Sequence, residues 1–369
     1  MESVHSKKED CSGCSACYNT CPTNAICMKA DEEGFLYPVI DQALCVDCNN
    51  CVNVCPLTQD GNYKNENIPE ILVAKHKSEE VLLKSTSGGI FTAISDAILG
   101  EGGVVYGAEY DDEFHVLHKR AENYEQRNSM RISKYVQSNM GEIFQEVEKD
   151  LVDNKKVLFT GTPCQIAGLK AFIGHSSLAY NLYLCDLICH SIPSPLVWED
   201  YKTLLEKEYG GRLTSVKFRT KEIDWSRENS KKAFLFTTSQ SEQVHNDTRF
   251  YKLFLEEKTI MRPSCEKCRF TDIHRASDIT IADYWGIEKY APEWMDKKGV
   301  SIILINNQKG EELLRKCNDE VKYEKRPKEE ALTEQQRLSE PVKFPEGRNK
   351  FWEDYGKYGF EYIIEQLDK

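Results

Sequence analysis

The segment that decides the first part of the fold is Cys11-Ser-Gly-Cys14-Ser-Ala-Cys17-Tyr-Asn-Thr-Cys21-Pro22, and its spacing returns in Cys45-Val-Asp-Cys48-Asn-Asn-Cys51-Val-Asn-Val-Cys55-Pro56. Each run has the pattern Cys-x2-Cys-x2-Cys-x3-Cys-Pro, which is typical of bacterial proteins that hold two 4Fe-4S clusters. In such a run three thiolates bind one cubane, and the fourth, stiffened by the proline, points toward the neighbouring cluster. We therefore expect two ligand sets, namely Cys11, Cys14, Cys17 with Cys55, and Cys45, Cys48, Cys51 with Cys21.

A pair of zinc sites is the alternative, because repeated Cys-x2-Cys also builds zinc knuckles and ribbons. Zinc needs four thiolates for each site and does not require two interlocked runs, so the pattern favours iron–sulfur clusters. Residues 34–40 between the runs predict a short apolar strand that links two similar halves. Residues 1–60 are thus expected to form a two-cluster ferredoxin module. Such a module carries electrons one at a time and does not choose a substrate.

Length and charge limit what the rest of the chain does. The 369 residues exceed what a ferredoxin needs, so one large or two ordinary further domains follow. The 48 Lys and Arg against 60 Asp and Glu give a net charge of −12, which disfavours a nucleic-acid or anionic-membrane partner. Residues 1–10 are polar and the longest apolar runs are too short for a membrane span. We expect a cytoplasmic protein whose 15 cysteines serve metal or redox chemistry.

Polar residues 58–69 predict a linker, and the residues beyond it predict an α+β (mixed α/β) fold with a mixed sheet. Strands are expected at residues 71–75, 104–108, 114–118, 157–159, 182–187, 213–219, 233–239, 278–282 and 300–305. Helices are expected at residues 90–99, 143–151, 165–173, 249–257 and 351–367, with one more from the Ser194-Pro195 cap to Gly210. A charged segment fills residues 322–349. The expected divisions are 71–155, 156–330 and a helical tail at 331–369.

Four further cysteines stand at turn or loop positions, namely Cys164, Cys189, Cys265 and Cys268. Loops after separate strands can bring four thiolates together from different directions, so these residues are candidates for a third 4Fe-4S cluster. The alternatives are ordinary buried cysteines, with a zinc site or a redox dithiol at the Cys-x2-Cys pair. The single cysteines at 27, 185 and 317 are interpreted as packing residues.

Two segments have the composition of anion-binding sites. Ser-Thr-Ser-Gly-Gly at 85–89 precedes an expected helix, and its hydroxyls, glycines and free N–H groups suit a flavin or nucleotide phosphate. A serine N-cap without a ligand is the alternative. Residues 131–138 gather cationic, hydroxyl and amide groups that suit a phosphate or a flavin carbonyl, or else form a solvated loop. Residues 278–286 end a strand with polar and aromatic groups, which suits either ligand contacts or a core aromatic.

Five segments, taken in order, resemble one family, and they are Ser-Thr-Ser-Gly-Gly at 85–89, Ser-Lys-Tyr-Val-Gln-Ser at 133–138, Gly-Thr-Pro-Cys-Gln-Ile-Ala-Gly-Leu at 161–169, Asp-Leu-Ile-Cys-His at 186–190, and residues 278–286. This is the coenzyme F420 hydrogenase/dehydrogenase beta subunit family, and the resemblance covers the chain from about residue 71 to the C-terminal helix. It implies an FAD-binding iron–sulfur oxidoreductase whose two-electron carrier is coenzyme F420 in archaeal members. It also implies that Cys164, Cys189, Cys265 and Cys268 ligate a third cluster, and that Ser87, Gly88, Gly89, Lys134 and Ser138 lie near the flavin. Ser191 stands where the family often has glycine, and no residue marks an F420 pocket in particular.

The expected function follows from the resemblance and the clusters together. Electrons would pass from 4Fe-4S clusters through FAD, which converts one-electron into two-electron chemistry, to coenzyme F420 or another small organic acceptor. Lys134 and His190 are the candidate catalytic residues, for proton supply or charge stabilisation near the ring. One alternative is a non-catalytic electron-transfer subunit that feeds a partner enzyme, and another is a disulfide reductase. A redox partner protein or subunit is expected as well.

Overall fold

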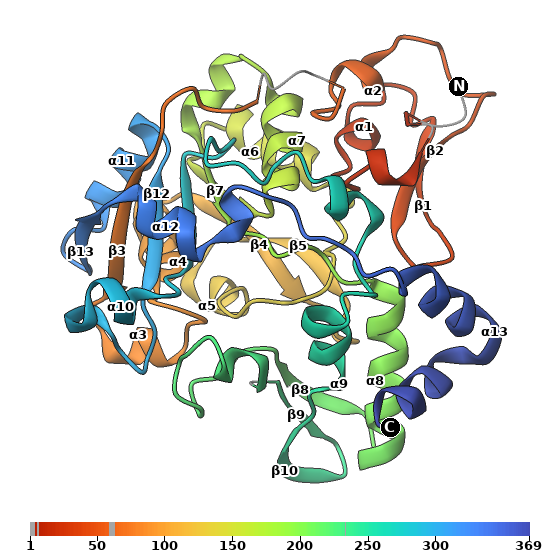
Figure 1. The fold of residues 1–369 in the computed structure, drawn as a ribbon. Helices are drawn as coiled ribbons and strands as arrows, with labels where there is room; N and C mark the ends of the chain where they lie inside the picture. Colours follow the sequence, from red (N-terminus) through yellow and green to blue (C-terminus); the bar gives the residue numbers. More distant parts are fainter. Residues whose placement is uncertain (1–3, 6, 59–62, 233) are drawn as a thin grey trace.

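The computed structural model describes residues 4, 5, 7–58, 63–232 and 234–369. Figure 1 shows the N-terminal module at the upper right, beside a large sheet, and a smaller strand-and-helix unit at the bottom. The expected mixed α/β fold with a mixed sheet is confirmed.

An eight-stranded sheet forms the centre of the molecule. In spatial order its strands are β13 (Val321–Arg326), β3 (Glu70–His76), β12 (Ser301–Ile305), β11 (Ile279–Asp283), β7 (Leu182–Leu187), β6 (Val157–Gly161), β4 (Val104–Tyr110) and β5 (Val116–Ala121). Strands β11, β7, β6 and β4 run parallel to one another, and the remaining neighbours are antiparallel. The carboxyl ends of the four parallel strands therefore lie along one edge, where open α/β sheets bind their ligands.

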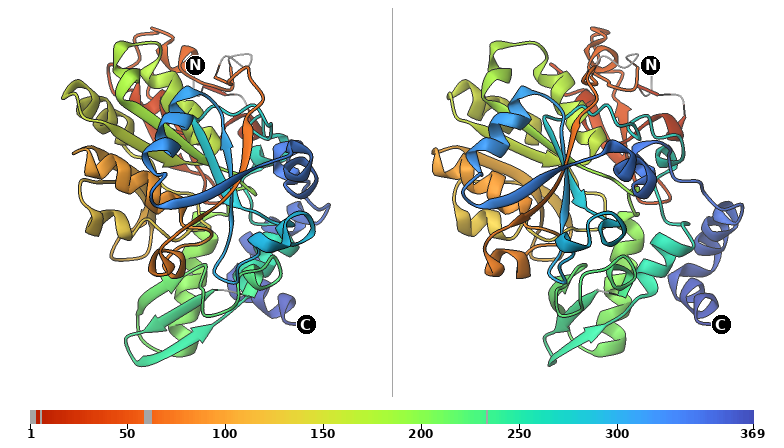
Figure 2. Two further views of the ribbon diagram at one scale, coloured as in Figure 1. Left: turned by 90° about the vertical axis from the view of Figure 1, so that its left-hand side faces the viewer. Right: turned by 60° about the vertical axis from the view of Figure 1, so that its left-hand side comes forward.

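Helices cover both faces of this sheet, because alternate side chains of its strands point to opposite sides (Figure 2). On one face, Leu158 and Ile303 belong to the core under α4 (Ile90–Gly100) and α11 (Gln308–Lys316). On the other, Phe159 and its neighbours pack on α6 (Ile143–Val152) and α7 (Pro163–Ile173), while β3 and β12 pack near α10 (Ile287–Tyr290) and α12 (Lys328–Glu334). Two short helices, α3 (Glu79–Leu83) and α5 (Tyr124–Asn128), lie near α4.

An aromatic core forms the smaller unit. It contains α8 (Pro195–Tyr209), α9 (Arg249–Tyr251), α13 (Arg348–Leu367) and a sheet in the order β10 (Ser241–Asn246), β9 (Leu235–Thr238), β8 (Leu213–Lys217). Trp198 is 1% exposed, and its ring lies 5.1 Å from that of Phe218 and 5.6 Å from that of Phe250. The helix expected at 249–257 is only partly α-helical, because Lys252–Glu256 form a π-helix. The expected tail helix is present and bends at Gly359, where φ is 81°.

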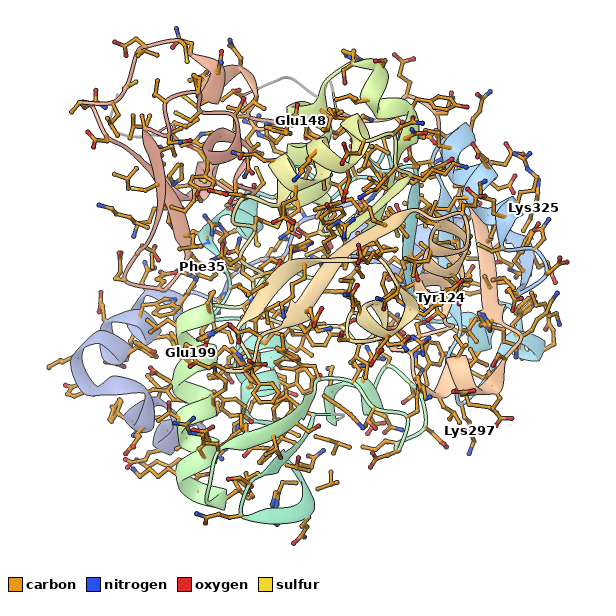
Figure 3. All side chains as sticks on the ribbon, turned by 180° about the vertical axis from the view of Figure 1, so that it is seen from behind. Phe35, Tyr124, Glu148, Glu199, Lys297 and Lys325 are labelled. Carbon is orange, nitrogen blue, oxygen red and sulfur yellow. The ribbon has the colours of Figure 1, made fainter. Side chains whose placement is uncertain are left out.

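The N-terminal module consists of α1 (Ala16–Asn19), β1 (Ile26–Ala30), β2 (Leu36–Ile40) and α2 (Asn50–Asn53). The turn between its strands docks on the start of α8, where Ser194 Oγ donates to the Glu33 carbonyl at 2.5 Å. Glu33 also pairs with Arg348 of α13, with Nη1 2.9 Å from Oε1. Phe35, labelled in Figure 3, is fully buried at this junction. The module is therefore held against the rest of the chain at a specific place.

Three expectations about local structure need correction. The strand expected at 114–118 begins only at Val116, because Phe114 has a φ of +60° and closes a turn with Asp111. The charged segment expected at 322–349 contains α12 and all of β13 except its first residue. β13 is an edge strand in which only Val321 is buried, so its charged sequence gave no strand signal. The expected linker is partly anchored: residues 59–62 lie outside the described part, but Tyr63 is buried, 5.2 Å from the ring of Phe270.

The predicted domain divisions stay predictions. Strands from both sides of residue 155 share the large sheet, and α12 runs across the division placed at 330. Residue 233, the first of an expected strand, lies outside the described residues.

Candidate functional site

The first predicted ligand set is gathered inside the N-terminal module. Cys11, Cys14 and Cys55 are each less than 9% exposed. Burial, and next the neighbouring thiols of this set, raise the pKa of Cys14, Cys17 and Cys55. These three thiols would not ionise unaided, whereas the positive charge of iron stabilises thiolates. The donor set therefore fits an iron–sulfur cluster.

The second set lies on the outer side of the module. Cys48 is exposed, and Cys21, Cys45 and Cys51 are half-buried. Burial raises the pKa of Cys51, with smaller contributions from Cys48 and Cys21. The Cys45 thiol lies 3.7 Å from Asp47 Oδ1 on the same loop.

The third set comes from three separate segments at the carboxyl edge of the sheet. Cys164 is the second residue of α7, Cys189 follows β7, and Cys265 and Cys268 lie at a 3-10 turn, Pro263–Lys267. Burial and the thiols of the other three raise the pKa of Cys189 well above its usual value. Burial, followed by Cys164, raises the pKa of Cys268 to about 11. The fold thus gathers the four cysteines, and their role as ligands stays a prediction.

Within the described residues, no group of three or more His, Cys, Asp or Glu side chains is placed to hold a single metal ion. In a cubane each thiolate binds a different iron, so its ligands stand farther apart than those around one ion.

The first and third sets are neighbours. Cys164 contributes to the raised pKa of Cys14, after burial, Cys55 and Cys11. Cys14 Sγ would lie only 2.9 Å from a Cβ added to Gly168 of α7, which is about one helical turn from Cys164. Arg262 also joins the two sets, since its Nε donates to the Cys11 carbonyl at 2.9 Å and it stands three residues before Cys265.

A cavity of about 580 Å³ opens beside the third set, at the carboxyl ends of the parallel strands. Of the residues that the sequence singled out as flavin contacts or catalytic candidates, all but Gly88 line this cavity. They are Ser87, Gly89, Lys134, Ser138 and His190. Cys189 lines the same cavity, so the third cysteine set borders it directly. Gly88 does not line the cavity, and its N–H donates to Ser301 Oγ at 2.9 Å.

The turn at 85–89 is fixed by contacts from distant segments. Lys221 Nζ donates to the carbonyls of Thr86 at 2.9 Å and Lys298 at 2.6 Å, and Ser87 Oγ donates to the Val300 carbonyl at 2.9 Å. The N-cap of α4 is Gly89 with a φ of 81°, so the alternative of a capping serine is wrong.

A buried hydrogen-bonded network under the cavity was not foreseen from the sequence. His118 Nε2 lies 3.0 Å from the Thr160 carbonyl, which only accepts, so Nε2 carries the proton and Nδ1 accepts from Ser138 Oγ at 2.8 Å. Burial lowers the pKa of His118 to about 4, which keeps the ring neutral. Gln165 Nε2 donates to Ser138 Oγ at 2.9 Å.

The same network reaches the third cysteine set. Gln165 Oε1 accepts from the backbone N–H of Thr162 at 2.9 Å, and Thr162 Oγ1 lies 3.2 Å from Cys164 Sγ. The partners of His118 are Ser138 and Thr160, which lie 20 and 42 positions away in the sequence. They come together because β5 pairs with β4, β4 pairs with β6, and residue 117 bridges to residue 139. The sequence around His118 carries no signal of these contacts.

Lys134 and His190 border the cavity differently. Lys134 Nζ donates to the Ser129 carbonyl at 2.6 Å, and burial lowers its pKa to about 7. The His190 side chain is exposed to the cavity, and desolvation by the segments that surround it lowers the pKa of its imidazole to about 4.

Residues 278–286 divide between the two roles considered for them. Tyr284 is fully buried in the core, whereas Asp283 and Trp285 line the cavity. Asp283 Oδ2 accepts from Arg219 at 3.0 Å, and Trp285 stacks on Trp225 at 4.9 Å.

The three cysteines outside the ligand sets differ in burial. Cys185 and Cys317 are buried, as expected of packing residues. Cys27 is exposed on β1, so the packing interpretation is wrong for it.

Comparison with known proteins agrees with this arrangement. Residues 10–58 match the 4Fe-4S dicluster domain, and residues 154–331 match the C terminus of the beta subunit of coenzyme F420 hydrogenase/dehydrogenase. The protein is therefore an iron–sulfur redox protein. The resemblance to the coenzyme F420 hydrogenase/dehydrogenase beta subunit family that the sequence motifs predicted is confirmed over residues 154–331.

One solved structure is a distant neighbour. It is a chain of the xenon-derivatised F420-reducing [NiFe] hydrogenase complex from Methanosarcina barkeri, 17% identical, with a TM-score of 0.49 over 81% of this chain and 96% of that one. Separately, the described part of the chain has no helix long and apolar enough to cross a membrane.

Proposed function

We propose that the chain is an iron–sulfur flavoprotein oxidoreductase that relays electrons from 4Fe-4S clusters through FAD to a two-electron acceptor, such as coenzyme F420 or another small organic molecule. The observation that carries the proposal is the order of the sites: three cysteine sets, of which the outermost is exposed and the innermost borders a cavity of about 580 Å³. Redox enzymes need an accessible point where electrons enter and an enclosed site for chemistry.

The twelve cysteines have distinct places in this scheme. Cys45, Cys48, Cys51 and Cys21 would hold the outer cluster, and Cys11, Cys14, Cys17 and Cys55 the inner one. Cys164, Cys189, Cys265 and Cys268 would hold a third cluster at the cavity wall. The contact of Cys14 with α7 supports electron transfer between the inner cluster and the third cluster.

The cavity fits a flavin in size and in its polar groups. FAD, when bound, supplies the conversion between one-electron transfer and two-electron chemistry. Ser87, Gly89 and Ser138 offer hydroxyl and backbone groups along one wall. Arg131, which also lines the cavity, has a buried Nε without a hydrogen-bond partner in the described structure, as expected of a group that awaits an anionic or carbonyl ligand.

Lys134 and His190 are the proposed catalytic contacts. Lys134 would hold a proton, or a positive charge, at Nζ on the cavity wall, where a reduced ring accumulates negative charge. His190 would contact the ring from the side of Cys189.

A redox partner protein is proposed for the outer cluster. Leu44 and Val46, beside Cys45, are 51% and 62% exposed, and such apolar side chains around an accessible cluster suit docking of another protein. A non-catalytic electron-transfer subunit would dock its partner through the same surface, but that alternative assigns no function to the cavity. A cytoplasmic location, favoured by the cysteine content, remains part of the proposal.

Anaerobic purification with an absorption spectrum, flavin release and a metal count tests the proposal. About twelve irons and one FAD per chain would support it. About eight irons without flavin would contradict the catalytic part, and zinc in place of iron at the third set would favour the zinc alternative.

A substitution identifies the third set. Cys268→Ser should lower the count from about twelve irons to about eight. Cys317→Ser, which changes a buried cysteine outside all three sets, should keep the full count. Equal counts in both variants would contradict a third cluster at Cys268.

A further inference from the structure

We infer that a second cavity, adjoining the first, binds a phosphate-bearing group. This cavity has a volume of about 500 Å³ and lies between the end of α3, the end of α5 and the segment that follows β8. Its charged lining residues are Lys84, Arg131, Lys217, Arg219, Lys221 and Glu222. Five cations against one carboxylate is a marked local excess in a chain whose net charge is −12.

Three of the cations already have partners. Lys84 Nζ lies 2.7 Å from Glu80 Oε1, and Arg219 pairs with Asp283 at 3.0 Å. Lys221 donates to backbone carbonyls of the turn at 85–89 and of Lys298, and the carboxylates of Asp283 and Asp296 act on its charge without forming an ion pair with it.

The other two cations form no ion pair among the described residues, and Asp96 and Glu80 only partly oppose the burial that lowers the pKa of Arg131. Neither Arg131 nor Lys217 forms an ion pair with any residue that the structure describes, and Arg131 Nε is buried without a hydrogen-bond partner there. A buried guanidinium nitrogen that lacks an acceptor is costly, and a phosphate oxygen is the acceptor that its planar fork suits best. These observations point to an anion as the missing partner.

The two cavities share four lining residues, Ser85, Arg131, Ile132 and Arg219. A ligand in the second cavity therefore reaches the wall of the first. The phosphate can belong to the tail of a flavin nucleotide whose ring occupies the first cavity, or to a separate phosphorylated substrate. The first source rests on the proposed function, whereas the anion site itself does not.

Inorganic pyrophosphate is the probe, titrated by calorimetry into the full-length protein with its clusters intact, once flavin-free and once loaded with FAD. We expect binding to the flavin-free protein that Lys217→Gln and Arg131→Gln each weaken about tenfold or more, because each removes a charged hydrogen-bond donor. Lys149→Gln is the matched control, since Lys149 is exposed on α6 and outside both cavities. Lys217 lines only the second cavity, so its substitution leaves the first cavity intact.

The two sources of phosphate give different results. If the cofactor supplies it, FAD abolishes pyrophosphate binding, and Lys217→Gln weakens FAD more than riboflavin. If a separate substrate supplies it, the FAD-loaded protein still binds pyrophosphate, and Lys217→Gln leaves the ratio of FAD to riboflavin affinity unchanged. Absence of pyrophosphate binding to the flavin-free protein, or equal affinity in the Lys217 and Lys149 variants, would overturn the inference. A protein that binds pyrophosphate but no flavin would refute only the proposed function.

Discussion

Arg262 connects the ferredoxin module to the rest of the chain through several contacts of one side chain. Its side chain is 1% exposed and donates to the carbonyls of Cys11 at 2.9 Å and Leu36 at 3.0 Å. Its Nη2 also lies 3.9 Å from Cys11 Sγ, and its guanidinium lies 4.3 Å from the ring centroid of Tyr37. No carboxylate of the described residues pairs with it, so a buried positive charge stands beside a proposed cluster ligand.

Arg262→Met should lower the reduction potential of the inner ferredoxin cluster. Reduction adds a negative charge, which the guanidinium stabilises at short range, so its loss should shift the potential by on the order of 50–100 mV. A redox titration followed by electron paramagnetic resonance measures the shift. Arg262→Lys keeps the charge and should recover most of the potential, whereas an unchanged potential in the Met variant would refute this electrostatic role.

Lys134 should react with amine reagents faster than ordinary surface lysines. Because burial lowers its pKa to about 7, about nine-tenths of it is neutral at pH 8, compared with less than about one-hundredth of an unperturbed lysine. The same shift means that its charged form costs folding free energy below pH 7, and that this cost falls as the pH rises toward the unfolded pKa near 10.4.

Mass spectrometry after brief exposure to an N-hydroxysuccinimide ester would compare Lys134 with Lys149. Lys134 should label first between pH 7 and 8, and FAD should protect it if the flavin occupies the first cavity. Equal labelling of the two lysines would show that Lys134 keeps an ordinary pKa.

At the scale of elements, local signals predicted the structure well where one segment contains the whole pattern. The strand predicted at 157–159 is present and extends to Gly161. The turn at Cys164 and the helix that follows were predictable because Thr162, Pro163 and Gln165 form a complete capping unit. The edge strand β13 was missed because five of its six residues are not buried, which removes the alternation that marks a half-buried strand.

The functional sites likewise differ in whether a single segment contains their whole pattern. The two ferredoxin ligand sets follow from spacing within short runs, whereas the second cavity takes Lys84, Arg131 and Lys217 from three unrelated elements. The network from His118 to Cys164 likewise depends on strand pairing. No local pattern in the sequence contains such contacts, so they required the fold.

Gly168→Ala tests how closely α7 supports the inner cluster. Alanine usually stabilises a helix relative to glycine by about 1 kcal/mol. Here the added Cβ would lie 2.9 Å from Cys14 Sγ and 3.1 Å from its Cβ, so the ligand must move. We expect a loss of up to about four irons per chain, or an altered resonance spectrum of the inner cluster.

Gly356→Ala is the control for this substitution, because Gly356 lies in α13 and a Cβ there meets nothing within 4 Å. It should keep all irons and raise the melting temperature slightly. A Gly168 variant with the full iron content and an unchanged spectrum would show that the approach of Cys14 to α7 does not constrain the cluster.

At the scale of the whole molecule, exposure decreases from the outer cysteine set to the inner one, and the cavity lies beyond both. The module lies beside α6 and α7 (Figure 1). This position sets the order, since Cys14 is buried next to α7 and Cys48 is exposed. The arrangement predicts that electrons from a protein donor enter at the outer set and nowhere on the smaller unit formed by α8 and β8–β10.

Val46→Glu should therefore slow reduction of the clusters by a small reduced ferredoxin, because it places a charge on an exposed apolar side chain beside the outer set. Loss of a favourable docking contact of this kind should reduce the rate about fivefold or more. Reduction by dithionite, which needs no docking, should be unchanged. Val244→Glu is matched in chemistry and lies 49% exposed on β10, far along the chain from the module, and it should leave both rates unaltered. If the two variants slowed the protein donor equally, the effect would come from net charge; if only Val244→Glu slowed it, electrons would enter through the smaller unit.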